Sequence, residues 1–176
     1  MDKKGSNPTL SKKEKVIVYL LKRLGGEVAG RKKLMKLMFL VEHYDPYKPT
    51  LIKKGLLDNT FIIYDYGVFS FEVMRDYTEL IRRGLLIEQR MSQTENRICI
   101  NRSKQIPATG LDETVTSRVD KIALDYGDWR PRELEISTLK ALGISEENKA
   151  KYFGQDVGQL INARFAALAH TSPVTA

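Results

Sequence analysis

Two glycines and the basic residues after them are the first place where residue spacing could support chemistry. Gly25 and Gly30 have the spacing of the glycines in a nucleotide-hydrolysing phosphate loop, and Arg31 and Lys32 follow them. Such a loop needs a lysine directly after the second glycine to reach the phosphates, and then a hydroxyl side chain to bind magnesium. Arg31 and Lys32 occupy those two positions, and a helical rather than a strand pattern precedes Gly25. The sequence therefore indicates that the segment from Gly25 to Lys32 is not a nucleotide-hydrolysing loop.

The same glycines are also typical of a turn between two helices. Gly25 or Gly26 can end the first helix in the left-handed conformation, and Gly30 can open the second. The free amides at the start of a helix attract anions, and neighbouring cations strengthen that attraction. Two interpretations stay open: this corner binds a nucleic-acid phosphate, or its cations only keep the surface soluble. The corner carries Arg31, Lys32 and Lys33, and Lys36 is expected on the polar strip of the second helix.

Residues that commonly catalyse reactions or bind metals are scarce in this sequence. Cys99 is the single cysteine, which excludes an internal disulfide and a cysteine zinc site within one chain. The two histidines lie in separate predicted elements, and His43 is expected to be a solvated residue on a helix. The sequence has no nucleophile–histidine–acid order, metal-ligand spacing or paired-carboxylate motif. We therefore expect no catalytic activity, no metal and no other cofactor.

Hydrophobic periodicity predicts the elements that would position these residues. Apolar residues recur at spacings of three and four in three segments, which predicts helices at 11–24, 31–44 and 71–83. A short strand is predicted at 61–64, and two alternating runs at 85–90 and 97–102 predict a hairpin. Prolines and glycines predict a long loop over 45–59 and a turn over 66–70. The tyrosines in and around these segments are expected to pack the loop onto the core or to stack on bases.

The second half of the chain is expected to be helical. Apolar patterns with helix-ending glycines and a first-turn proline predict helices after residue 111, one of them starting at Ser145. The expected class is mainly α with a small β-hairpin, an α+β fold. Four regions are predicted: a disordered N-terminus at 1–10, a winged-helix-like domain at 11–104, a helical extension at 111–170 and a disordered tail at 171–176.

Charge is distributed unevenly along the chain. Residues 1–54 carry fourteen Lys and Arg against five Asp and Glu, whereas residues 55–176 carry fifteen against seventeen. A basic region of this kind attracts a phosphate backbone over a Debye length of about 10 Å, although a solvated helix face would have the same composition.

The apolar run at 16–21 is too short for a signal peptide or a membrane span. We therefore expect a cytoplasmic protein without membrane contact.

The predicted order of helix, turn, helix, strand, helix and hairpin is close to that of a winged helix-turn-helix domain. Such a domain places its third helix in the major groove of DNA and its hairpin against the adjacent backbone. Glu72 and Glu79 share the outward face of the third helix with its arginines, and they would repel that backbone. The residues predicted to contact DNA are Arg31, Lys32, Lys33, Lys36, Arg75, Arg82, Arg83, Arg90 and Arg97.

Two segments resemble a known family. The run from Gly30 to Leu37 and the run from Tyr66 to Ser70, with the helix that ends before Leu85, are similar to the YwgA-like proteins of bacteria and archaea and, more distantly, to Panacea/SocA-like domains. Family members carry Gly-Arg-Lys-Lys-Leu-Gln-Lys and aromatic-Gly-Pro-Tyr-Ser. This chain has Met35 in place of the glutamine, Val68 in place of the proline and Phe69 in place of the tyrosine. The resemblance covers about residues 12–102.

This resemblance implies two kinds of function. YwgA-like proteins are commonly regarded as winged-helix transcriptional regulators, whereas Panacea domains are implicated as antitoxins that neutralise partner proteins. The first expectation is therefore a DNA-binding regulator, with a helical extension that supports a homodimer. The alternative is an antitoxin-like module that binds a protein partner, and the acidic residues on the third helix favour it.

Overall fold

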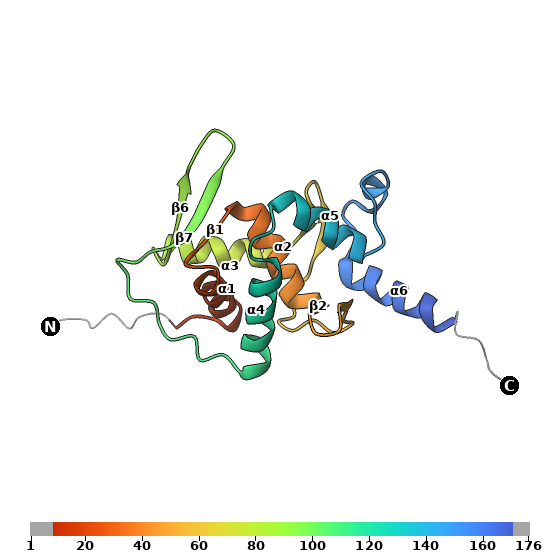
Figure 1. The fold of residues 1–176 in the computed structure, drawn as a ribbon, viewed down its shortest axis with the longest axis horizontal. Coiled ribbons are helices and arrows are strands. Elements are labelled where there is room, and N and C mark those ends of the chain that lie inside the picture. Colours follow the sequence, from red (N-terminus) through yellow and green to blue (C-terminus); the bar gives the residue numbers. More distant parts are fainter. Residues whose placement is uncertain (1–8, 171–176) are drawn as a thin grey trace.

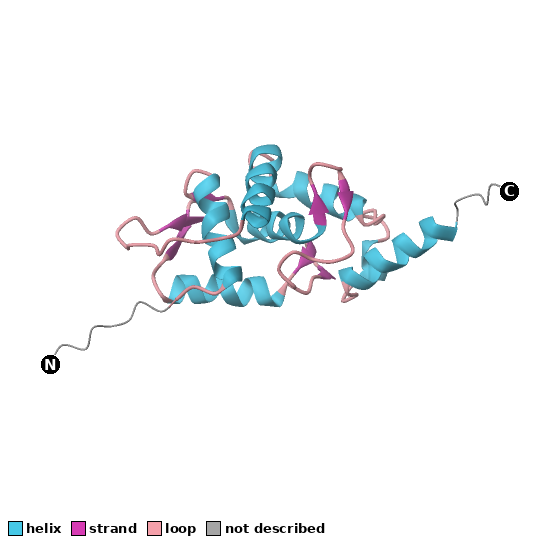
Figure 2. Cartoon of the chain, turned by 90° about the horizontal axis from the view of Figure 1, so that it is seen from below, coloured by secondary structure: helices cyan, strands magenta, loops and turns pink. Residues whose placement is uncertain are grey.

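The structure is a computed structural model that describes residues 9–170, and it belongs to the α+β class. Six α-helices are combined with three small antiparallel sheets (Figures 1 and 2). Most of the two segments expected to be disordered, 1–10 and 171–176, lies outside the described residues. Leu10 is described, and it is buried against the core. None of the helices in residues 9–170 combines the length and the apolar character that a membrane crossing requires.

Three helices and one three-stranded sheet form the N-terminal part. The sheet has the order β1-β7-β6 and is antiparallel throughout, with Glu27 opposite Cys99 and Leu86 opposite Ile100. Its β6–β7 hairpin projects from the helices (Figure 1). The predicted helices and hairpin are thus confirmed. The bounds are α1 (Lys12–Arg23), β1 (Glu27–Val28), α2 (Gly30–His43), α3 (Phe71–Arg82), β6 (Leu86–Arg90) and β7 (Asn96–Ile100).

Two further hairpins lie between α2 and α3. The segment 45–59 was expected to be a loop, but its first part forms β2 (Tyr44–Asp45) and β3 (Thr50–Leu51). The expected turn over 66–70 contains a strand as well, because β5 (Gly67–Phe69) pairs with β4 (Ile62–Tyr64). Both hairpins are visible in Figure 2. Strands this short lack a clear alternating pattern, which is why their pairing was not predicted.

The C-terminal half packs into the same hydrophobic core as the N-terminal half. Helix α4 lies against α1 and α2, and α5 lies against α2 and β5. The helix expected at Ser145 does not form there: Ser145 and Asn148 exchange hydrogen bonds in a turn, and a short 3-10 helix follows. The bounds are α4 (Glu113–Tyr126), α5 (Pro131–Ala141), η1 (Lys149–Tyr152) and α6 (Val157–His170).

Helix α2 is the central element of the core. Most of its side chains are buried, because α4, α5 and the hairpins cover it on several sides. Its polar residues are covered too. His43 was expected to be solvated, yet it is buried with its ring 5.6 Å from that of Phe39 and 6.0 Å from that of Phe61. This expectation is wrong because periodicity describes one helix alone, whereas burial depends on the elements packed around it.

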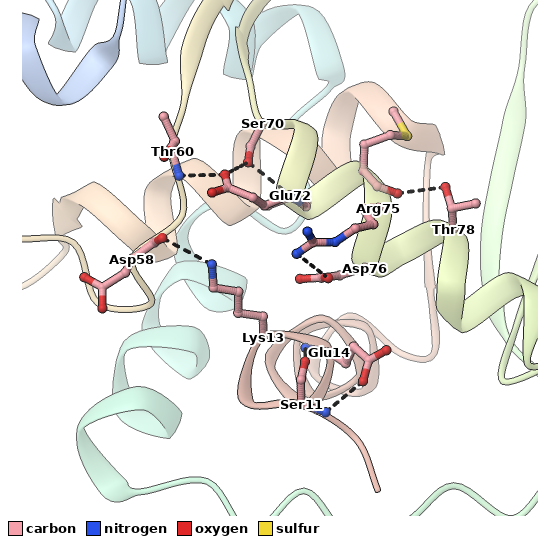
Figure 3. Close-up of polar contacts among 12 residues, drawn as sticks. Ser11, Lys13, Glu14, Asp58, Thr60, Ser70, Glu72, Arg75, Asp76 and Thr78 are labelled. Atoms are coloured by element: carbon pink, nitrogen blue, oxygen red, sulfur yellow. Dashed lines mark hydrogen bonds and ion pairs between the residues drawn. The ribbon is translucent and has the colours of Figure 1, made fainter. Parts of the chain in front are cut away.

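Polar contacts attach both α1 and α3 to the segment before β4 (Figure 3). Ser11 and Glu14 form a reciprocal capping box at the start of α1, and Ser70 caps α3 by accepting from the Val73 amide. Glu72 accepts from the Thr60 amide at 2.8 Å. The carboxylate of Glu72, expected to face a partner, is therefore used inside the chain. These contacts fix the start of α3 beside the β4–β5 hairpin.

Candidate binding face at the start of helix α2

A cavity of about 500 Å³ lies at the start of α2. Its walls come from the first turns of α2, the tip of the β4–β5 hairpin and the tip of the β6–β7 hairpin, with Met74 of α3 and Pro131 of α5 at its edges. The two segments that carry the family resemblance, around Gly30 and around Gly67, thus meet at one place. Pockets of about 300–1,000 Å³ are typical ligand sites in proteins, so this cavity is large enough to be functional.

Gly30 brings the start of α2 against the tip of the β6–β7 hairpin. Its φ of +80° is a conformation that side chains disfavour, and a Cβ there would lie 3.1 Å from the carbonyl oxygen of Asn96. The N-cap residue Ala29 provides no side-chain hydrogen bond, and the first turn of α2 contains no acidic residue. The positive end of the α2 dipole therefore lies at the cavity wall without an acidic residue in the first turn of the helix.

Lys36 is a buried wall residue of the cavity, and its side chain is only 2 % exposed. Its Nζ donates to the carbonyl oxygen of Val68 at 3.2 Å. Burial lowers the pKa of Lys36 to about 8, although Glu135 nearby opposes this shift. A buried cation costs stability, and groups with such perturbed pKa values are frequent at functional sites.

Lys33 is also turned into the protein, and its Nζ donates to the carbonyl oxygen of Gly127. Burial lowers the pKa of Lys33, against the attraction of Asp128 and Glu133. The expectation that Lys33 and Lys36 present their charges at the surface is therefore wrong. Both lie on the side of α2 that α4, α5 and β5 cover. Of the lysines expected at this corner, Lys32 is the exposed one, and its Nζ lies 3.2 Å from the centre of the Tyr66 ring.

The arginines predicted to contact DNA all have partners inside the chain. Arg31 donates through Nε and Nη2 to Glu88, at 3.0 and 2.7 Å, and Tyr77 donates to the same carboxylate at 2.6 Å. The Arg31 guanidinium holds the pKa of Glu88 below its usual range. The other contacts are Arg75–Asp76 at 3.4 Å, Arg82–Glu79 at 2.7 Å, Arg83–Glu14 at 3.3 Å, Arg97–Glu27 at 2.9 Å, and Arg90 Nε to the carbonyl oxygen of Ser92 at 3.2 Å.

Aromatic rings lie beside the cavity, and we call Tyr64, Phe69, Phe71 and Phe153 the aromatic patch; Phe69 is half-buried and the other three are exposed. Tyr64 stacks on Phe153 with 5.0 Å between ring centres, and Phe69 meets Phe71 edge to face at 5.0 Å. Phe71 is 64 % exposed and Phe153 is 54 % exposed. Phe71 and Phe153 both contact Tyr64. No local signal in the sequence could predict this association, because 82 positions separate Phe71 from Phe153.

An ion cluster around the buried carboxylate of Glu135 supports the β4–β5 hairpin. The carboxylate of Glu135 pairs with Lys149 at 3.2 Å and with Arg132 at 3.3 Å, and Lys149 also donates to the carbonyl oxygen of Asp65 at 2.7 Å. A Cβ on Gly67 would lie 3.2 Å from Cγ of Glu135. The hairpin tip is therefore packed closely against α5.

The Gly67→Ala variant is expected to lose about 2–4 kcal/mol of unfolding free energy, from backbone strain at positive φ together with overpacking. Gly154→Ala is the matched control, because Gly154 has φ +79° and a Cβ there meets nothing within 4 Å. We expect the control to lose only about 1 kcal/mol, the strain contribution alone. Urea unfolding of both variants measures the difference, and equal losses would contradict the close packing of Gly67.

Comparisons of this chain with protein-family models, with curated proteins and with solved structures give no match. Function is therefore inferred from the geometry of the chain itself. Among the described residues, no three His, Cys, Asp or Glu side chains are grouped as a metal site would need. The arrangement at the start of α2 offers a cavity with buried positive charge and an adjoining aromatic surface, and both features suit binding.

Proposed function

We propose that this chain is a protein-binding module and that the aromatic patch is its docking surface. The observation that carries this proposal is the contiguous cluster of four aromatic rings, three of them exposed, over β4, β5, α3 and the segment after η1. Aromatic residues are enriched at the centres of protein interfaces, and exposed apolar patches on monomers often mark such sites. The proposal includes no catalytic step, and an antitoxin-like neutraliser of a partner protein is the activity that it suits.

The charges around the patch support a protein partner over a polyanion. Glu72 and Glu79 lie on α3, the helix that carries Phe71, and the nine cations predicted to bind DNA all have intramolecular contacts. Lys33 and Lys36 are buried and the Arg83 side chain is only 12 % exposed, so moving them to a phosphate would require local rearrangement of the chain. A partner that presents an apolar ridge needs no such rearrangement.

Purification of the tagged chain from native lysate, with and without nuclease, tests this proposal. We expect a stoichiometric partner that resists nuclease and is lost from the Phe71→Ser/Phe153→Ser double variant. Truncating a central aromatic residue commonly costs about 2 kcal/mol or more, so the pair should weaken binding more than 100-fold. Leu124→Ser is the matched control, because Leu124 is an exposed apolar residue on α4, outside the patch. A partner retained equally by both variants would overturn the proposal.

DNA binding is the second candidate, and the order of elements favours it. The succession α1-β1-α2-α3-β6-β7, with the sheet order β1-β7-β6, is consistent with a winged helix-turn-helix scaffold. Exposed ion pairs are worth only about 0–1 kcal/mol, so Arg75, Arg82 and Arg97 could exchange their carboxylates for phosphates. Affinity for a DNA duplex that falls steeply with salt and is lost on charge reversal of these arginines would favour this candidate. Loss of the captured material on nuclease treatment would favour it too.

A further inference from the structure

The cavity beside the aromatic patch has walls that are mainly apolar. Two methionines and three aromatic rings line it: Met35, Met74, Tyr64, Tyr66 and Phe69. The Sδ atom of Met35 accepts from the Ser70 amide at 3.2 Å, which fixes this side chain against the start of α3. Methionine sulfur and aromatic rings both make favourable contacts with a further aromatic ring. The lining therefore suits an uncharged aromatic group.

The cations in the cavity wall already have contacts inside the chain. Arg31 pairs with Glu88 at 2.7 Å, and the ammonium group of Lys36 donates to the carbonyl oxygen of Val68. Lys32 lies over the face of an aromatic ring. An anion would have to compete with each of these contacts, so the cavity does not select a negatively charged occupant.

Two carboxylates at the exposed edge of the cavity have no such contacts. Asp65 lies in the turn of the β4–β5 hairpin and Glu95 in the loop of the β6–β7 hairpin, and both exposed residues line the cavity. In the part of the chain that the structure describes, neither carboxylate forms an ion pair. Complementary charge on a partner fixes its register at an interface. The edge of the cavity therefore favours a cation.

We propose that this cavity receives an aromatic side chain of the protein partner, beside a lysine or arginine of the same partner segment. This inference rests on the proposed function, because the docking surface continues into the cavity through Tyr64 and Phe69, which belong to both. The ring contacts the two methionines, and the cation faces Asp65 and Glu95. A buried aromatic residue in a pocket is a common anchor at the centre of an interface, and about 500 Å³ is ample for one.

NMR of the methionine methyl groups tests this inference, because the chain has methionines inside and outside the cavity. Met35 and Met74 line it, whereas Met38 is buried in the core and Met91 is exposed after β6. The purified chain is titrated to millimolar concentration with three blocked dipeptides: N-acetyl-Phe-Lys-amide, N-acetyl-Phe-Glu-amide and N-acetyl-Ala-Lys-amide. We expect the first dipeptide to shift the signals of Met35 and Met74 and to leave those of Met38 and Met91 in place.

The other two dipeptides separate the ring from the charge. The Phe-Glu dipeptide should bind about threefold or more weakly than the Phe-Lys dipeptide, since exposed charge contacts are worth about 0–1 kcal/mol, and the Ala-Lys dipeptide should cause no shift. Absence of shifts at Met35 and Met74 with the Phe-Lys dipeptide would overturn the inference, and so would equal shifts with the Ala-Lys dipeptide. Tighter binding of phenethylamine, a free aromatic amine, would overturn the assignment to a protein segment. Shifts of these two signals with protein concentration alone would mean that a second copy of the chain fills the cavity, which would overturn it too.

A double variant assigns the charge preference to the edge of the cavity. Asp65→Asn/Glu95→Gln should bind the Phe-Lys and Phe-Glu dipeptides equally, and both positions are exposed, so the fold is retained. Glu113→Gln/Glu147→Gln removes two exposed carboxylates outside the cavity and should keep the preference of the wild type. A preference that both double variants keep, or that both lose, would overturn the role of Asp65 and Glu95.

Failure of this inference can be distinguished from failure of the proposed function, because the titration leaves Phe71 and Phe153 unchanged. A partner that is lost from the Phe71→Ser/Phe153→Ser variant, together with unshifted signals of Met35 and Met74, would overturn this inference alone. Shifted signals, together with a partner that the same variant retains, would overturn the proposed function alone.

Discussion

The Glu42→Ala variant is expected to lose about 3–5 kcal/mol of unfolding free energy, the largest effect of a single substitution that we predict in this chain. Glu42 is 0 % exposed, and its carboxylate accepts from the Leu57 amide at 2.7 Å and from Nδ2 of Asn59 at 2.9 Å. Alanine would leave both donors buried without an acceptor. It would also leave a void in a region where even a Cβ on Gly55 would collide with the carboxylate.

Urea unfolding at neutral pH measures this loss, and two further variants calibrate it. Glu42→Gln keeps the shape and one acceptor oxygen but turns an amide donor toward another donor, so its loss should be intermediate. Glu147→Ala removes an exposed carboxylate and should stay within about 0.5 kcal/mol of the wild type. If Glu42→Ala were as stable as Glu147→Ala, Glu42 would not hold the segment that leads into β4.

Glu42 also influences the position of the β4–β5 hairpin. It joins α2 to residues 56–59, and those residues deliver the chain to Phe61 and the β4–β5 hairpin. The hairpin in turn carries Tyr64 and Phe69 of the aromatic patch. Glu42 is therefore a positioning residue for the proposed binding face, although it lies in the core.

Local patterns in the sequence were sufficient to predict α1, α2 and α3, although the helix expected at Ser145 is a turn. Ser11 and Ser70 act as N-caps, and Pro131 occupies the first turn of its helix, as capping preferences indicate. The apolar stripe of α3 was predicted from the same periodicity, and Val73, Tyr77 and Leu80 are buried. These features depend on residues within a few positions of one another, so the local sequence is enough to predict them.

The binding face could not be predicted in the same way, because its contacts join distant parts of the chain. Arg31 pairs with Glu88, and Tyr64 stacks on Phe153. The burial of Lys36 depends on packing by α5 and β5, which lie far along the sequence. A lysine on a helix is normally solvated, so composition alone favours a basic surface. The nine cations predicted to bind DNA instead have contacts inside the chain, and this difference is why we propose a protein rather than DNA as the partner.

Stability is expected to fall as the pH is lowered from about 6.5 to about 4, and His43 is the cause. Burial lowers the pKa of His43 to about 4, against smaller opposing contributions from the Ile52 backbone and Asp156. The unfolded chain binds a proton at His43 below its ordinary pKa of about 6.5, whereas the folded chain does not. The unfolded state is therefore favoured progressively through this window. A difference of about 2.5 pKa units corresponds to about 3 kcal/mol by pH 4, and the full contribution of His43 is present above pH 6.5.

Urea unfolding at pH 7 and at pH 4.5 measures this effect as the difference between the two free energies. In the His43→Leu variant, which cannot titrate at this position, the difference should shrink by about 2–3 kcal/mol relative to the wild type. Replacing the imidazole ring by leucine also changes the unfolding free energy by an amount that does not depend on pH. This amount cancels when the free energies at the two pH values are subtracted. Glu42 acts in the opposite direction, since burial raises its pKa and favours the folded state at low pH. An unchanged difference in His43→Leu would mean that the imidazole is protonated in the folded chain, and the packing of His43 against Phe39 and Phe61 would then have to admit water.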